Sequence, residues 1–254
     1  MQVLNAPTDM TELRAIQLTE LDILKVIDKI CSKHKLNYWL TDGTLLGAKR
    51  HGGFIPWDDD IDLCIMRDEY KTLVEILPEA LPKGYKMIIK GNPDSEMNRK
   101  SPWLTGVTIE KNGYPGFVDF FPIDKSFHSR FMGELQQKLY KYLVLPFRLE
   151  PLRGVKKLRS FTAKLVSFFI APEVLEQKIF NMYTKSKNQR FRYSLSDSKF
   201  AHYFDEAQIF PLSKIEFEKI KFPAPAQVHE YLVEIYGPDY MTPPPEKKRR
   251  PMHT

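Results

Sequence analysis

Four closely spaced carboxylates at 58–62 (Asp-Asp-Asp-Ile-Asp) constrain this chain more than any other feature of its sequence. Carboxylates at such spacing repel one another strongly unless a cation lies among them. If the segment is extended, Asp58, Asp60 and Asp62 project from one face, and the apolar residues of 61–65 form the opposite, core-facing side. The pattern predicts a site for a hard cation, Mg²⁺ or Mn²⁺, on a strand that is buried on its other face.

Two other interpretations of this segment are available. The spacing of Asp58, Asp60, Asp62 and Glu69 matches that of an EF-hand calcium loop, but the loop needs glycine where this chain has Leu63. A solvated acidic turn is the simpler alternative, and it would be the default for an acidic cluster that stood alone. The sequence on either side favours a catalytic cation site instead.

A candidate phosphate-binding turn lies just upstream of the carboxylates. Residues 38–40 read as a short apolar strand, Gly43 and Thr44 as a turn, and Leu45 as the start of a helix. Backbone N–H groups at the start of a helix, together with the Thr44 hydroxyl, are suited to hold a phosphate. Three candidate phosphate contacts follow: Lys49, Arg50 and His51. A phosphate cradle followed by paired carboxylates supplies both halves of a phosphoryl-transfer site.

A third carboxylate that would complete such a site is Asp119. It lies in the apolar run 116–124, which reads as a buried strand. A carboxylate in such a setting is usually paired or bound to a metal, although capping of a neighbouring turn is the alternative. Asp124, which follows Pro122, is expected to be a turn or capping residue.

Three blocks of the chain resemble the LicD family of phosphotransferases. The first block is 39–70, with the turn, the Arg50-His51-Gly52-Gly53 segment and the carboxylates; the second surrounds Asp119; and the third is 231–253. The blocks occur in the family's order, whereas residues 125–200 resemble no family that we can name.

This resemblance implies an α+β, nucleotidyltransferase-like fold, with a mixed β-sheet flanked by helices as in fukutin-type proteins. It implies that Asp60 and Asp62 are the paired metal ligands, that Asp119 is the third acidic residue and that Asp58 is a further candidate ligand. Gly43 and Thr44 match the turn that holds the donor phosphates. From the C-terminal block, the candidate phosphate contacts are Lys247, Arg249, Arg250 and His253.

The activity implied by the resemblance is transfer of phosphorylcholine, or of an alditol phosphate, from a CDP-linked donor to a sugar hydroxyl of a bacterial surface glycan. CMP is the leaving group, and the acceptor is a glycan or a lipid-linked glycan. A nucleotidyltransferase that transfers the NMP of an NTP is the enzymatic alternative. A non-enzymatic adaptor at a membrane surface, whose carboxylates merely bind a cation, is the other.

We expect one catalytic domain over 1–254, with a basic helical insertion at 125–200. Helices are expected at 10–36 and 67–81, and strands at 85–90 and 104–110, separated by a polar loop at 91–101. Two cysteines, no evident signal peptide and no membrane-spanning run favour a cytoplasmic protein.

Charge is concentrated in residues 125–192, which hold fifteen Lys or Arg and four Glu, a net charge of +11. Basic and apolar residues at helical spacing suit peripheral contact with an anionic membrane. The alternative is a helical subdomain whose basic face meets solvent. We expect no nucleic-acid partner, because no recognisable nucleic-acid module accompanies the basic residues.

Overall fold

The computed structural model describes residues 10–89, 107–148, 156–182, 189–193 and 202–251. The expected loop at 91–101 and the candidate contact His253 lie outside these ranges.

The described chain forms two compact units. Unit 1 contains the described residues within 1–88, 107–121 and 206–254, and unit 2 contains those within 89–106 and 122–205. All of the predicted carboxylate ligands belong to unit 1.

A β-sheet forms the centre of unit 1. Its strands, in spatial order, are β1 (Tyr38–Leu40), β2 (Ile61–Met66), β5 (Phe117–Phe127), β4 (Val107–Lys111) and β3 (Tyr85–Ile89). β1 is antiparallel to β2, and β4 is antiparallel to β5. Because β2 and β5 are neighbours, the sheet brings together two segments that are far apart in the sequence and that carry Asp62 and Asp119.

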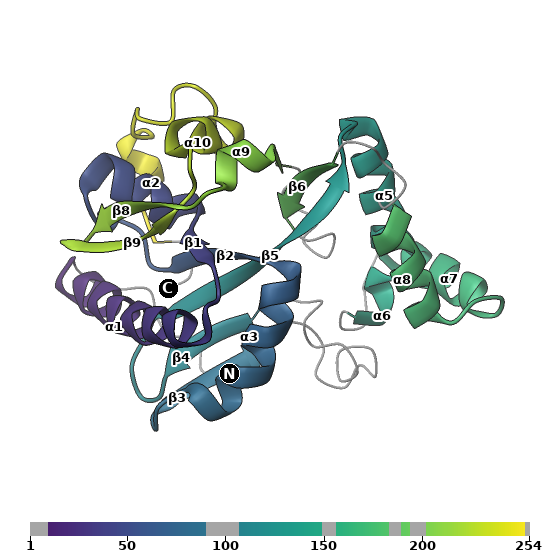
Figure 1. Cartoon of the computed structure of the whole chain (residues 1–254), viewed down its shortest axis with the longest axis horizontal. Helices are drawn as coiled ribbons and strands as arrows, with labels where there is room; N and C mark the ends of the chain where they lie inside the picture. The colour runs from purple at the N-terminus through teal and green to yellow at the C-terminus, as the bar shows by residue number, and fades with distance from the viewer. Residues whose placement is uncertain (1–9, 90–106, 149–155, 183–188, 194–201, 252–254) are drawn as a thin grey trace. The chain divides into compact units, whose positions relative to one another are not determined.

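Three helices accompany the sheet: α1 (Met10–His34), α2 (Asp42–His51) and α3 (Arg67–Ala80) (Figure 1). The helices predicted at 10–36 and 67–81 are therefore confirmed. α1 is long enough to repeat an apolar stripe over several turns, and its Ile23, Leu24 and Ile27 are fully buried. The α+β class, with helices flanking a sheet, is confirmed.

The start of α2 differs from the prediction. The helix begins at Asp42 and not at Leu45, so Gly43 and Thr44 lie in its first turn. Asp42 has a φ of 43°, and this left-handed residue turns the chain abruptly from β1 into the helix. The helix ends at His51 and is capped by Gly52, whose φ of 73° is favourable for glycine.

The C-terminal part of unit 1 packs beside α2 and β1. It contains α9 (Glu206–Ile209), the antiparallel hairpin β8 (Ser213–Phe217) and β9 (Ile220–Ala224), α10 (Val228–Tyr236) and a 3₁₀ helix (Glu246–Lys248). Aromatic side chains attach it to the first block: the ring centroids of Phe54 and Phe217 are 4.8 Å apart, and those of Trp39 and Phe210 are 5.9 Å apart.

Helices form most of the described part of unit 2 (Figure 1). Its elements are α5 (Arg130–Leu143), α6 (Leu145–Arg148), α7 (Lys156–Ser167), α8 (Pro172–Phe180), β6 (Gln189–Tyr193) and β7 (Tyr203–Phe204). A small core holds the helices together and contains Tyr140, Val144, Leu145 and Ile179.

Glu176 has two buried polar partners in unit 2. Arg148 and Glu176 form a buried ion pair at 2.6 Å, and the Tyr140 hydroxyl donates to Glu176 at 2.9 Å. The expectation for Asp124 was wrong: β5 continues to Phe127, and Asp124 lies buried within it, opposite Arg192 of β6. The strand therefore continues beyond the apolar run, through Lys125 and Ser126 to Phe127.

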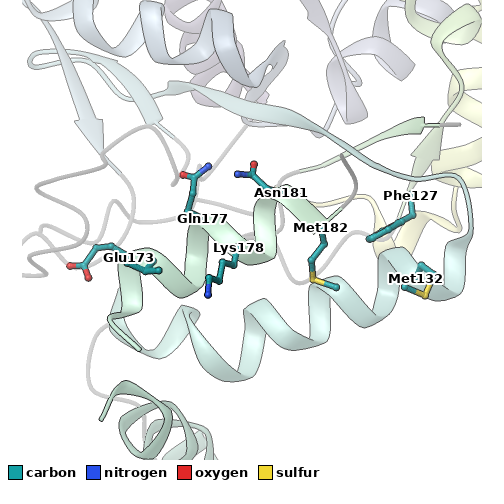
Figure 2. A pocket seen from close by; sticks show the side chains of 8 residues that line it. Phe127, Met132, Glu173, Gln177, Lys178, Asn181 and Met182 are labelled. Carbon is teal, nitrogen blue, oxygen red and sulfur yellow. The ribbon is translucent and has the colours of Figure 1, made fainter. Parts of the chain in front are cut away.

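A pocket of about 850 Å³ lies within unit 2 (Figure 2). Met132 of α5 and Val174 and Met182, at and beyond α8, give it an apolar wall, and Glu173 and Gln177 lie at its edge. None of the predicted site residues lines this pocket.

Among the residues that the structure describes, no helix is long and apolar enough to cross a membrane. Cys31 and Cys64 are both buried, and they form no disulfide with each other.

Candidate functional site

The centre of the site is the loop that precedes β2. One carboxylate oxygen from each of Asp58, Asp59 and Asp60 lies within 4.8 Å of the others. The strand begins at Ile61, so 58–60 are not extended, and the condition under which Asp58, Asp60 and Asp62 would share one face of a strand is not met. A loop permits three consecutive carboxylates to converge, and for this reason Asp59, which alternation assigned to the opposite face, joins the cluster.

Backbone and side-chain hydrogen bonds hold this loop in place. The N–H of Asp58 donates to the carbonyl of Ile55 at 2.9 Å, and the Gln17 side-chain amide donates to the carbonyl of Asp58 at 2.9 Å. Gln17 is buried on α1. The first helix therefore fixes the loop that presents the carboxylates.

The glycine pair that precedes the loop is held by Glu218, at the turn of the β8–β9 hairpin. Its carboxylate accepts from the N–H of Phe54 at 3.3 Å and pairs with Arg14 at 2.6 Å, while its own N–H donates to Gly52 at 2.9 Å. A Cβ at Gly53 would collide with this carboxylate. The hydrogen bond from Arg14 lowers the pKa of Glu218.

The start of α2 holds the backbone of Asp62 on both sides. The N–H of Asp62 donates to the Thr44 hydroxyl at 2.8 Å, and its carbonyl accepts from the N–H of Thr41 at 3.1 Å. Thr44 is buried. Its hydroxyl oxygen thus has a structural role that the sequence did not indicate.

Gly43 lies directly against the carboxylate cluster. A Cβ at this position would be 2.7 Å from the Asp58 Oδ2 atom, so only glycine fits without a shift. The first backbone hydrogen bond of α2 runs from the N–H of Leu45 to the carbonyl of Thr41. The N–H groups of 42–44 precede it, which is the arrangement that binds anions at a helix N-terminus.

Asp119 lies on β5, the neighbour of β2, and is 6% exposed. The Thr108 hydroxyl of β4 donates to its Oδ1 atom at 2.5 Å across the antiparallel pair. The predicted buried strand around Asp119 is therefore confirmed, and its carboxylate is oriented by a cross-strand partner.

The carboxylates influence one another. Burial raises the pKa of Asp62 well above its usual value, and the charges of Asp60, Asp42, Asp119 and Asp58 raise it further. Asp42 was not among the predicted residues; it reaches the group because α2 begins there. Such convergence of like charges is the arrangement that a bound cation relieves.

Glu20 of α1 is a further buried carboxylate that the sequence analysis missed. It is fully buried, its Oε1 atom accepts from the N–H of Phe117 at 3.4 Å, and its Oε2 atom has no hydrogen-bond partner among the described residues. Burial raises its pKa well above the usual value, and the charges of Asp60, Asp59 and Asp58 add to this shift. Its signal in the sequence was an acidic residue on the apolar face of a helix.

Two of the predicted cationic residues lie together beside the cluster. Arg50 donates to the carbonyl of Tyr240 at 3.1 Å, and the Arg249 guanidinium lies 5.3 Å from the centre of the Trp57 ring. Burial lowers the pKa of Arg50; the charge of Arg249 lowers it too, whereas Asp58 raises it. The C-terminal segment thus returns to the first block, as the sequence suggested.

The other predicted contacts are placed less centrally. His51 lies edge-on to Trp57 with ring centroids 6.3 Å apart, and burial followed by the Arg50 charge lowers its pKa. Lys49 is exposed on α2 and forms no ion pair with the described carboxylates. His253 lies outside the described residues.

Tyr236, at the end of α10, is a second residue that the sequence analysis did not single out as a site residue. Its side chain is 43% exposed. Burial raises the pKa of its hydroxyl, and the charges of Asp42, Asp62, Asp58 and Asp60 contribute. A neutral tyrosine among these carboxylates is a candidate hydrogen-bond donor to a bound substrate.

These observations agree with a site for a divalent cation and a phosphate. Carboxylate oxygens are the ligands that Mg²⁺ and Mn²⁺ prefer, and the oxygens of 58–60 converge closely enough to share one ion. Gly43, in the first turn of α2, lies against Asp58, and the charges of Asp58 and Arg249 act on Arg50.

A comparison with known protein families matches the part of the chain that contains the carboxylate loop and Asp119. Residues 35–156 match the family model described as LicD/FKTN/FKRP, nucleotidyltransferase domain. The chain is 29% identical to the lipopolysaccharide cholinephosphotransferase LicD of Haemophilus influenzae over 95% of its own length and 96% of that protein. It is 42% identical to the human ribitol 5-phosphate transferase FKRP over 57 residues, which cover 22% of this chain and 11% of that one. Residues 35–156 therefore carry a LicD-family domain, and the chain is a phosphotransferase, as the names of the matching relatives indicate.

Proposed function

We propose that this protein transfers phosphorylcholine from a CDP-activated donor to a sugar hydroxyl of a bacterial surface glycan and releases CMP. The convergence of Asp58, Asp59 and Asp60 beside Gly43 at the start of α2 carries this proposal. The similarity to a lipopolysaccharide cholinephosphotransferase over nearly the whole length of both chains supports phosphorylcholine as the transferred group. The same proposal includes a nucleotidyltransferase-like catalytic fold with a basic helical insertion. It also includes a cytoplasmic location, where CDP donors are made.

Mg²⁺ or Mn²⁺ is the proposed cofactor, held by the carboxylates of Asp58, Asp59 and Asp60 with Asp62 close to them. When bound, the ion supplies positive charge to the donor diphosphate and to the departing CMP. The acidic loop itself would repel that diphosphate, so the cation and the substrate are expected to bind together.

The chain's own groups bind and orient the two substrates. N–H groups of 42–44 donate to donor phosphate oxygens at the N-terminus of α2. Arg50 and Arg249 offset charge on the CMP that leaves. Asp119, oriented by Thr108, is our candidate for positioning the acceptor hydroxyl for attack on the choline-bearing phosphorus.

The test is CMP release from CDP-choline with Mg²⁺ or Mn²⁺ and a lipopolysaccharide acceptor, with labelled choline followed into the glycan. Asp62→Asn is expected to lower the rate roughly hundredfold or more. Asp68→Asn is the matched control, because the Asp68 side chain is 96% exposed on α3. The control is expected to keep full activity.

Other outcomes would correct the proposal in defined ways. CMP release from CDP-ribitol but not from CDP-choline would identify an alditol phosphate transferase, the activity named for FKRP. Pyrophosphate release from an NTP, without CMP release from any CDP-linked donor, would identify the nucleotidyltransferase alternative.

A further inference from the structure

Helix α7 of unit 2 presents large apolar side chains to solvent. The exposed fractions are 65% for Phe161, 53% for Leu165, 85% for Phe168 and 87% for Phe169. Phe161 and Leu165 lie about one turn apart on one face of the helix, and Phe168 and Phe169 lie in the turn that follows its last residue, Ser167. We call these four residues the α7 stripe.

The stripe is not the core-facing side of the helix. Ala163, on another face of α7, is 1% exposed, and α7 packs against α5 and α6 within unit 2. The helix therefore already has a buried face, and the stripe is additional. Single exposed apolar residues are common, but a contiguous group of phenylalanines this exposed usually marks an interaction surface.

The charge around the stripe identifies the kind of partner. Residues 151–172 contain five Lys or Arg and no Asp or Glu. Lys164 is exposed on α7, next to Leu165 and one turn from Phe161 and Phe168. A partner surface for this segment must therefore be apolar and negatively charged at the same place.

A second copy of the chain meets this requirement poorly. In a symmetric dimer the same patch faces itself, so Lys164 would approach its own counterpart with no acidic residue of 151–172 to pair with. An anionic bilayer satisfies both demands, since its acyl chains accept the phenylalanines and its phosphates lie at the level of the lysine ammonium.

We propose that the α7 stripe docks unit 2 on an anionic lipid bilayer, with Phe161, Leu165, Phe168 and Phe169 inserted at the boundary between head groups and acyl chains. Lys164 stays at the phosphate level. This is a peripheral contact, and it does not depend on the identity of the transferred group.

The test is co-sedimentation of the full chain with vesicles of phosphatidylcholine alone and of phosphatidylcholine with phosphatidylglycerol. We expect binding to the anionic vesicles that weakens at high salt. Phe168→Ser/Phe169→Ser is expected to weaken it at least about tenfold, because two apolar anchors are lost. Lys164→Glu is expected to weaken vesicle binding severalfold, because one basic contact is lost and one repulsive charge is gained.

Tyr114→Ser is the matched control, since Tyr114 is a 58% exposed aromatic residue of unit 1 and lies outside the stripe. It is expected to leave binding unchanged. Circular dichroism and thermal unfolding establish that each variant is folded.

Equal binding of wild type and the double variant would overturn the proposal. The proposal would also be overturned if the wild type did not bind anionic vesicles but formed a dimer that the double variant does not form. The stripe would then be a self-association surface.

Discussion

The hydroxyl of Thr44 accepts a hydrogen bond from the backbone N–H of Asp62 at 2.8 Å. This contact joins the first turn of α2, the proposed phosphate cradle, to the strand that carries a proposed metal-site carboxylate. The phosphate-binding and acidic parts of the site are therefore mechanically coupled, although 18 positions separate the two residues.

Thr44→Val is expected to lower the free energy of unfolding by about 1–3 kcal/mol, because it leaves the buried N–H of Asp62 without an acceptor. Thr44→Ser keeps the hydroxyl and is expected to lose less than Thr44→Val. Denaturant unfolding of the two variants provides the comparison. A loss for Thr44→Ser as large as that for Thr44→Val would mean that the methyl group contributes as much as the hydrogen bond, and a smaller loss for Thr44→Val would contradict the prediction.

Gly43→Ala is expected to impair the site more than the fold, because the new Cβ would lie 2.7 Å from Asp58 Oδ2. We expect the metal concentration for half-maximal activity to rise roughly tenfold as Asp58 is displaced. A metal titration of CMP release checks this, with Asp58→Ala as the reference for complete loss of that carboxylate. An unchanged titration curve for Gly43→Ala would show that Asp58 does not contribute to metal binding.

Glu20→Gln is expected to stabilise the metal-free protein by about 1 kcal/mol at neutral pH. Burial raises the pKa of Glu20, so its ionised form is disfavoured in the fold and costs stability as pH rises above the usual carboxyl range. Gln keeps an acceptor for the N–H of Phe117 and removes the charge. Thermal unfolding without metal, with the exposed Glu75→Gln as control, makes the measurement. A clear loss of stability would show that the charge of Glu20 is compensated by its surroundings.

The Arg14–Glu218 pair is expected to give a pH-dependent contribution to stability. The pKa of Glu218 is lowered in the fold. Its ionised carboxylate therefore stabilises the protein at pH values above the unfolded pKa of 4.5, and this stability is lost as the pH falls through the folded pKa. Because the Arg14 side chain is 44% exposed, Arg14→Gln is expected to cost only about 0.5–1 kcal/mol at pH 7.

The same Arg14→Gln substitution is expected to cost much less at about pH 3, where Glu218 is largely protonated. Unfolding curves at the two pH values check the sign. Lys25→Gln, which removes an exposed pair with Asp22, is the control and is expected to have little effect at either pH. A larger cost of Arg14→Gln at the lower pH would contradict the linkage.

Local patterns were enough to predict much of the chain. The helical spacing of 10–36 and 67–81 and the apolar run around Asp119 each depend on neighbours in sequence, and α1, α3 and β5 follow them. Family resemblance and chemistry also singled out Asp58 and Asp60, whose oxygens converge. Boundaries were less well predicted: strand alternation was extended through 58–60, where the chain forms a loop.

Local patterns could not predict contacts between segments that are far apart in the sequence. Asp42 reaches Asp62 because its own positive φ starts α2 early, and Glu20 approaches the acidic loop because α1 packs against the segment that Gln17 holds. The charges of the carboxylates act on the Tyr236 hydroxyl because α10 packs beside α2.

By itself, the sequence determined which carboxylates, glycines and arginines are present and which family their order resembles. Only the tertiary structure decided which of these groups meet. The periodicity of side chains along one helix or strand is encoded by neighbours in the sequence. The pairing of β2 with β5 and the return of the C-terminal segment to Arg50 depend instead on the burial of many apolar side chains at once.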